Sequence, residues 1–347
     1  MEVDEDISVI ESNVSEDCPE AFGDISCITT DGNHVIKEIG SDVSDQEVSI
    51  LASSKDYTSY NTTDLMEISD VLGLVGKKWS IYRVSPLWNL QFKAKYLKSI
   101  SEQLKDYITS NLKKHKQVHS FSNISVEIEA KEVHDECIAL KIQVIYLESN
   151  ILLYTGVLLK SPNYSEKYNM TKLSEMPVLM VQGNTSFILA VHEWLAEHFD
   201  CIIRPYEFAN YQVLWLIAIS MADAGTSYNN TVSYHYLFKY ELSKGKMDVK
   251  CSVESEFLRS TLSKISLIQS LTSEENSFHY SHLIKIHAEI EDHFKMTSGI
   301  NVSKLKLIAF EAPKVVSINV SGKIRAESST LMDLIMNYIM ELVNKSL

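Results

Sequence analysis

The sequence of 347 residues contains little of what builds fibres, membrane spans or disulfide frameworks. It has only 11 glycines and six prolines, which argues against a low-complexity or fibrous chain. Its longest apolar run, near Val213–Ala222, has about ten residues, whereas a bilayer span needs about 20, so we expect no membrane association. The five cysteines are widely spaced without a CxxC pair, which excludes the usual zinc and redox motifs and predicts free thiols.

Motifs for catalysis are also missing. Gly73 and Gly76 precede Lys77 as in a phosphate loop, but the motif needs four residues between its glycines and Ser or Thr after the lysine. His192 and His198 would lie about 240° apart around a helix, so they cannot hold a metal from one face. We therefore expect no enzyme activity, cofactor, metal or small-molecule substrate; an unrecognised catalytic site is the remaining alternative.

A group of histidines near the C-terminal third is the other metal candidate. His279, His282, His287 and His293 lie among acidic residues, but their spacing supplies no fourth convergent ligand. His287 and Glu291 are four residues apart, so they are expected to pair on one helix face. Surface or capping histidines are the favoured interpretation.

Basic residues are nearly missing from the first 68 residues. That segment holds 17 acidic residues against Lys37 and Lys55, a net charge of −15, while the whole chain carries −14. It is rich in Ser, Asp, Glu and Asn and shows no helical or alternating apolar pattern, which predicts a disordered acidic tail over residues 1–70. A solvated extension without a partner and a functional acidic tail both remain open.

Residues 77–116 have the opposite charge, with ten Lys and Arg against two acids. Apolar residues at spacings of three and four predict a helix over 93–115 whose other face is rich in lysine. Such a face can neutralise nucleic-acid phosphates, although a solvated amphipathic helix is the commoner explanation. The candidates for contact with the DNA backbone are Lys77, Lys78, Arg83, Lys95, Lys98, Lys113, Lys114 and Lys116.

The order of apolar patterns predicts the fold class. Alternating residues over 124–128, 138–144 and 151–160 predict an antiparallel meander, followed by helices over 186–199 and 208–222. After a turn at 225–230 come a hairpin over 232–253, two helices, strands over 302–310 and 315–326 hinged at Pro313, and a final helix. This order predicts an α+β protein with two lobes, residues 71–225 and 226–347.

Several segments resemble one known family, centromere protein L. KKWSIYRVSPLW at 77–88 resembles its K-x-W-x-x-Y-x-x-x-P-L-aromatic opening, and WLAEHFDC at 194–201 resembles its W-x(4)-F-D-C segment. Trp215, the HFK at 293–295 and the GKI at 322–324 resemble later elements of the family in the same order. The similarity extends from about residue 72 to the C-terminus and does not include residues 1–68.

This resemblance implies a non-enzymatic structural subunit of the constitutive centromere-associated network in the nucleus. It implies a heterodimer with centromere protein N, contacts with other inner-kinetochore subunits, and a role on centromeric nucleosomes in chromosome segregation. The implied fold is α+β with curved antiparallel sheets and a dimerising C-terminal lobe. The alternative function is a general nucleic-acid-binding protein that uses the Lys-rich helix over 93–116.

The segment 315–326 is the expected partner interface. It is interpreted as one long strand near the end of the strand order, and we hypothesise that it adds to the partner's sheet. An ordinary interior strand is an equally good interpretation. The interface candidates are Val316, Ile318, Val320, Lys323 and Ile324.

Overall fold

The computed structural model describes residues 69–345 apart from 71, 115–122, 134–135, 161–171, 228–234, 243–246, 259, 262 and 265–279. The predicted disordered tail therefore lies outside the described residues, except for Ser69 and Asp70. These two residues are helical, and the Ser69 side chain is buried.

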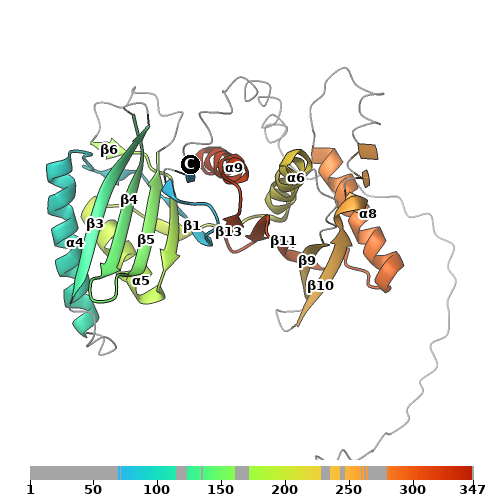
Figure 1. The fold of residues 1–347 in the computed structure, drawn as a ribbon, viewed down its shortest axis with the longest axis horizontal. Helices are drawn as coiled ribbons and strands as arrows, with labels where there is room; N and C mark the ends of the chain where they lie inside the picture. The colour runs from blue at the N-terminus through green and yellow to red at the C-terminus, as the bar shows by residue number, and fades with distance from the viewer. Residues whose placement is uncertain are drawn as a thin grey trace, which may run out of the picture. The chain divides into compact units, whose positions relative to one another are not determined.

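Eleven of the described strands form one antiparallel sheet, which confirms the α+β class (Figure 1). Its order is β10-β9-β11-β12-β13-β1-β7-β5-β4-β3, with β8 pairing with β1 beside this path. The strands are β1 Trp79–Val84, β3 Ile124–Val133, β4 Glu136–Tyr146, β5 Ile151–Leu159, β7 Val178–Gly183, β8 Ile203–Pro205, β9 His235–Leu242, β10 Met247–Glu254, β11 Lys306–Ala312, β12 Val316–Asn319 and β13 Lys323–Ala326. Two short strands, β2 Leu87–Trp88 and β6 Leu173–Ser174, pair separately.

The predicted meander is confirmed as β3, β4 and β5. β3 pairs with β4 from Ile124↔Tyr146 onwards, and β4 pairs with β5. One face of this meander is covered by helices α4 (Ala94–Lys114) and α5 (Thr185–Phe199), whose apolar sides share a core with alternate residues of the strands (Figure 1). The alternation of apolar and polar residues therefore predicted both the strands and the face that they bury.

A second core joins helices α6 (Asn210–Ser227), α8 (Tyr280–Ser298) and α9 (Ser329–Lys345) to the strands β9 to β13. β5 and β7 contribute to both cores, because their alternate residues point to opposite faces: Leu158 packs with α4 and α5, whereas Val157 belongs to the second core. A strand buried on both faces reads as a continuous apolar run, as β5 does. The second core also contains residues from both sides of the predicted lobe boundary near 225, which stays a prediction.

The prediction of one long strand over 315–326 is wrong. The segment is a hairpin, in which β12 turns back into β13 with Ile318 opposite Ile324. The turn is built by Asn319, whose side chain accepts a hydrogen bond from the Ser321 backbone N–H at 2.7 Å, and by Gly322 at a φ of +73°. A side chain at Gly322 would place its Cβ 2.1 Å from the backbone oxygen of Tyr206, so the position requires glycine.

Candidate interaction surfaces

Helix α4 carries part of the predicted basic surface. It buries Leu97, Ile100 and Leu104 against β3, and Lys95 and Lys98 are exposed. The acidic residues Glu102 and Asp106 are exposed on the same helix, so its outer side has mixed charge. Lys113 and Lys114 lie in the last turn of α4 with side chains outside the described set, and Lys116 lies outside the described residues.

The other predicted basic residues lie elsewhere on the sheet. Lys77 and Lys78 are exposed immediately before β1, and Arg83 is half-buried within it. Three strands separate β1 from β3, the strand under α4, which is about 19 Å along a sheet with 4.8 Å spacing. The structure therefore does not join these three residues with Lys95 and Lys98 into one basic surface.

A lysine cluster that the sequence interpretation missed lies on the sheet face opposite α4. Lys141 in β4 alternates with Leu140 and Ile142, which pack toward α4, so its side chain points the other way. Burial lowers the pKa of Lys141, and repulsion from Lys131 and Lys77 lowers it further. Lys131 also binds Glu129 at 2.6 Å, which contributes to the lowered pKa of that carboxylate. Alternation along β3 and β4 was the signal that could have identified this cluster.

The candidate partner interface at 315–326 is not a free sheet edge. β12 pairs with β11 and β13, and β13 pairs with β12 and β1, so both strands are interior. Val316, Ile318 and Ile324 are buried in the core, Val320 is half-buried and Lys323 is exposed. Strand addition at this segment is therefore excluded, because its backbone groups are already paired along the sheet. Whether Lys323 contacts a partner stays a prediction.

Among the described strands, β10 and β3 stand at the two ends of the strand order, and the three-residue strand β8 pairs with β1 beside it. β10 pairs with β9 on one side only, and it buries Cys251 and Val253 while Lys250 and Glu254 are exposed. β3 pairs with β4 on one side only. An edge strand has unpaired backbone N–H and C=O groups that can accept another strand.

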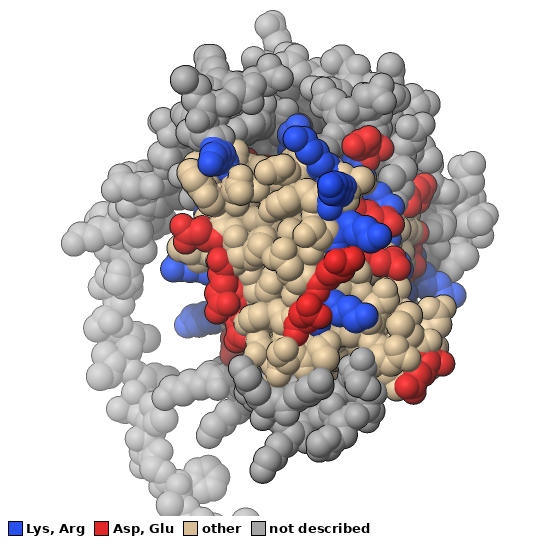
Figure 2. All heavy atoms as spheres, turned by 90° about the vertical axis from the view of Figure 1, so that its left-hand side faces the viewer, with Lys and Arg blue, Asp and Glu red and all other residues tan. Residues whose placement is uncertain are grey.

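An open groove of about 570 Å³ runs between the N-terminal half of α4 and the edge strand β3. Apolar side chains from both elements line it, among them Leu97, Val126 and Ile128. Four acidic residues surround them, and acidic side chains stand on two sides of a strip of uncharged atoms on this face (Figure 2). These four are Glu102, Glu127, Glu129 and Glu132.

His192 and His198, whose spacing argued against a shared metal ion, both pack against aromatic rings. Burial lowers the pKa of His192 to about 4, and its ring packs edge-on against Tyr82 with centroids 4.6 Å apart. His198 stacks on Trp194 at 4.5 Å. Across the described residues, no group of three His, Cys, Asp or Glu side chains is arranged to hold a metal ion.

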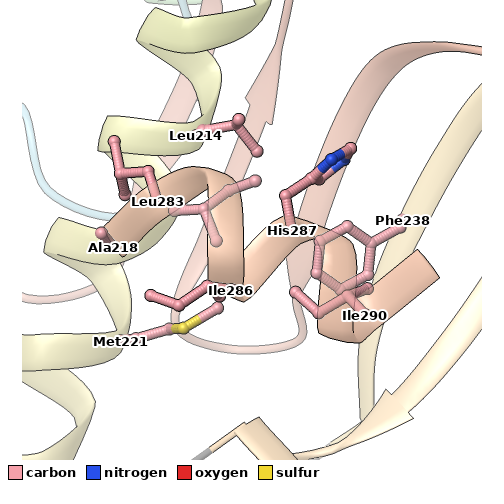
Figure 3. Close-up of a pocket in the computed structure, with 9 residues that line it drawn as sticks. Leu214, Ala218, Met221, Phe238, Leu283, Ile286, His287 and Ile290 are labelled. Carbon is pink, nitrogen blue, oxygen red and sulfur yellow. The ribbon is translucent and has the colours of Figure 1, made fainter. Parts of the chain in front are cut away.

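The predicted pair of His287 and Glu291 is confirmed, with Nδ1 and Oε1 3.3 Å apart. Burial lowers the pKa of His287 and raises that of Glu291, so burial disfavours the charged form of both. His287 lines a cavity of only about 10 Å³ between α6 and α8, where its neighbours Leu214, Met221 and Ile286 are apolar (Figure 3). His279 lies outside the described residues. His287 therefore lies in the packed contact between helices α6 and α8.

The residues that resemble the family motifs are mostly buried in the core or end a helix. Trp79 is fully buried and its indole N–H donates to the Leu74 backbone oxygen at 2.9 Å. Trp194 and Phe199 are buried in the core under α5. Asp200 ends this helix in the left-handed conformation at a φ of 48°, and Cys201 is a buried free thiol. Burial raises the pKa of the Cys201 thiol to about 11, which keeps it protonated.

The described part of the chain is thus an α+β protein with one open antiparallel sheet. Comparison with protein families matches residues 73–345 to centromere protein L, so the chain belongs to this family. The family is a structural component of the kinetochore; the chain is accordingly a centromere and kinetochore protein, associated with the nucleus and chromosome segregation. No curated protein matches the chain. None of the described helices has the length and apolar character of a membrane span.

Proposed function

We propose that this chain is a non-enzymatic scaffold of the inner kinetochore that forms a heterodimer with centromere protein N. The observation that carries the proposal is the family match over residues 73–345, which includes nearly all of the described fold. In this role the pair supports the assembly of other inner-kinetochore subunits on centromeric nucleosomes. The C-terminal lobe, residues 226–347, provides the dimer surface.

The edge of β10 is the part of that lobe best suited to pairing. Its unpaired backbone groups can continue the sheet into a strand of the partner. Cys251 and Val253 are buried on one face, so an added strand would place its own apolar residues beside them. Lys250 and Glu254 on the exposed face add polar contacts that fix the register.

The test uses a pair of proline substitutions, Val249→Pro and Lys250→Pro. In an antiparallel strand the N–H groups of neighbouring residues point to opposite sides, so one substitution removes a bond to β9 and the other removes an edge donor. Val249 also packs against the core, so Val249→Pro is compared with Val249→Ala, and Lys250→Pro with the wild type. The proline variant that melts at the same temperature as its reference has lost only the edge donor. We expect this variant to lose co-purification with centromere protein N.

Each variant is a control for the other, because both place one proline in β10 and they differ in the side of the strand that loses an N–H group. Retained co-purification by the thermally stable variant would contradict the β10 interface. Failure of the wild-type chain to pair with centromere protein N at all would contradict the heterodimer itself.

Contact with the DNA backbone is a second part of the proposal. Lys77 and Lys141 support it, because the charge of Lys77 lies close enough to Lys141 to lower its pKa, whereas Lys131 is paired with Glu129. The Lys-rich α4 supports the alternative, a general nucleic-acid-binding protein, less well, because Glu102 and Asp106 are exposed beside its lysines. A scaffold should bind DNA strongly only together with its partner, whereas a general binder should do so alone.

A further inference from the structure

We propose that the α4–β3 groove binds an extended peptide in which basic and apolar residues alternate. The groove lies at the end of the sheet opposite to β10, so this partner is additional to the one proposed above. The proposal rests on the shape of the groove, the unpaired strand beside it and the charge around it.

The interior of the groove is apolar. Leu97 belongs to α4, and Val126 and Ile128 belong to β3, and all three also pack in the core that these elements share. The half-buried Phe92 closes the side next to the start of α4. With a volume of about 570 Å³, the groove has room for several side chains of an extended segment.

The backbone of β3 directs an extended rather than a helical ligand. β3 pairs with β4 as far as Lys131↔Ala139, after which the register shifts at a β-bulge. Along this regular stretch the other side of β3 faces no described strand, so its outward N–H and C=O groups can pair with a peptide. A peptide strand placed there alternates its side chains between the two faces of the sheet.

The side chains of β3 specify what those alternate positions should be. Val126 and Ile128 point toward α4, so every second peptide residue enters the apolar groove. Glu127 and Glu129 are exposed and alternate with them, so the intervening peptide residues meet carboxylates. Glu102 and Glu132 add negative charge to the groove, against Lys98 alone among its basic lining residues.

This charge selects between possible occupants. Lysine or arginine side chains complement Glu102, Glu127 and Glu132, whereas nucleic-acid phosphates would be repelled. Glu129 is already paired with Lys131 at 2.6 Å. Residues 1–68 of the chain itself carry a net charge of −15, so they are also a poor occupant. The groove therefore fits a basic segment of another protein.

The probe is a labelled peptide of alternating lysine and valine, titrated into the full chain and read by fluorescence anisotropy. Two further peptides separate the contributions: one replaces lysine by glutamate, and one retains lysine but is N-methylated at alternate residues so that it cannot pair with β3. We expect binding of the first peptide only. Equal binding of the N-methylated peptide would overturn the assignment to a strand edge.

Matched variants localise the binding. The double variant Glu102→Lys, Glu127→Lys reverses one charge on each side of the groove, and we expect affinity to fall about tenfold or more. Asp106→Lys reverses one charge on the exposed surface of α4 outside the groove, and should leave affinity nearly unchanged, whereas Glu102→Lys alone should lower it. An equal loss in these two single variants would show a diffuse charge effect and overturn the site.

Two other occupants are outcomes of the same experiment. A DNA duplex that competes with the peptide would assign the groove to nucleic acid, and stronger peptide binding after deletion of residues 1–68 would assign it to the chain's own tail. Either result overturns the proposal. All variants should still co-purify with centromere protein N, so failure of the peptide to bind leaves the proposed scaffold function standing.

Discussion

The two edges of the large sheet, β3 and β10, offer the same backbone groups but different surroundings. β3 is bordered by α4 and by a groove rich in glutamate, whereas the exposed side chains of β10 include both Lys250 and Glu254. Because backbone pairing alone cannot distinguish one extended partner from another, the neighbouring side chains must do so. We infer that each edge selects its own class of strand.

The largest expected effect comes from the strand that links the two ends of the sheet. Trp79→Ala in β1 removes a fully buried indole and its bond to Leu74, and should lower the free energy of unfolding by about 3–5 kcal/mol. Chemical denaturation monitored by circular dichroism measures this. Both edges should lose binding together, which tests whether they belong to one cooperative sheet.

Trp88→Ala is the matched control, since this tryptophan is 48% exposed in the short strand β2. It should change the free energy of unfolding by no more than about 0.5–1 kcal/mol. Comparable destabilisation by both substitutions would show that β1 has no special role in joining the two ends.

The hairpin turn next to β1 gives the next effect. Gly322→Ala forces a Cβ against the Tyr206 backbone at a positive φ, and should cost about 2–3 kcal/mol of the free energy of unfolding. Gly299 has a similar φ of +71° but nothing within 4 Å, so Gly299→Ala should cost only about 1 kcal/mol. Thermal melts of the two variants compare them, and equal shifts would contradict the assigned close approach.

The stability of the fold should depend on pH through Asp333, a buried residue of α9. Burial raises the pKa of Asp333 to about 7; hydrogen bonding with Ser69 opposes this shift, and the charge of Asp70 adds to it. An acid with a raised folded-state pKa binds more protons folded than unfolded, so stability should fall as pH rises from 3.8 to about 7. Asp333→Asn should remove this part of the pH dependence in urea titrations. An unchanged pH profile in the variant would contradict the assignment.

The smallest effect concerns the face opposite α4. If Lys77 and Lys141 contact phosphates, changing both to Gln should reduce the slope of log affinity for DNA against log salt by about 2. The matched pair on α4, Lys95→Gln with Lys98→Gln, lies beside the acidic groove and should reduce it less. The measurement is a salt titration of the complex with centromere protein N; a larger loss in the α4 pair would reverse this ranking.

Local sequence patterns predicted the elements well. The meander, α4, α5 and α9 followed from apolar residues at spacings of two or of three and four, since burial of one face imposes that period. The pair of His287 and Glu291 followed from helical spacing alone. The hairpin at 315–326 was missed because alternation continues through Val320 and Lys323, while the turn depends on Gly322 and the Asn319 side chain.

Long-range arrangement was the part that the sequence could not provide. Strand order decides which strands are edges, and β13 pairs with β1 from the other end of the chain. The basic stretch at 77–116 is contiguous in sequence, but the fold puts Lys77 near Lys141 and places Lys98 beside four glutamates. The charge pattern along the chain therefore identified a lysine-rich segment, but it could not show that its lysines lie on different faces of the protein.

The most direct test of two selective edges is amide hydrogen exchange of the full chain with and without centromere protein N. Exchange reports whether backbone N–H groups are protected, and the two edges can be followed in one experiment. We expect added protection of residues 247–254 on addition of the partner and no change over residues 124–131. Protection of the β3 edge instead, or of neither edge, would contradict the account.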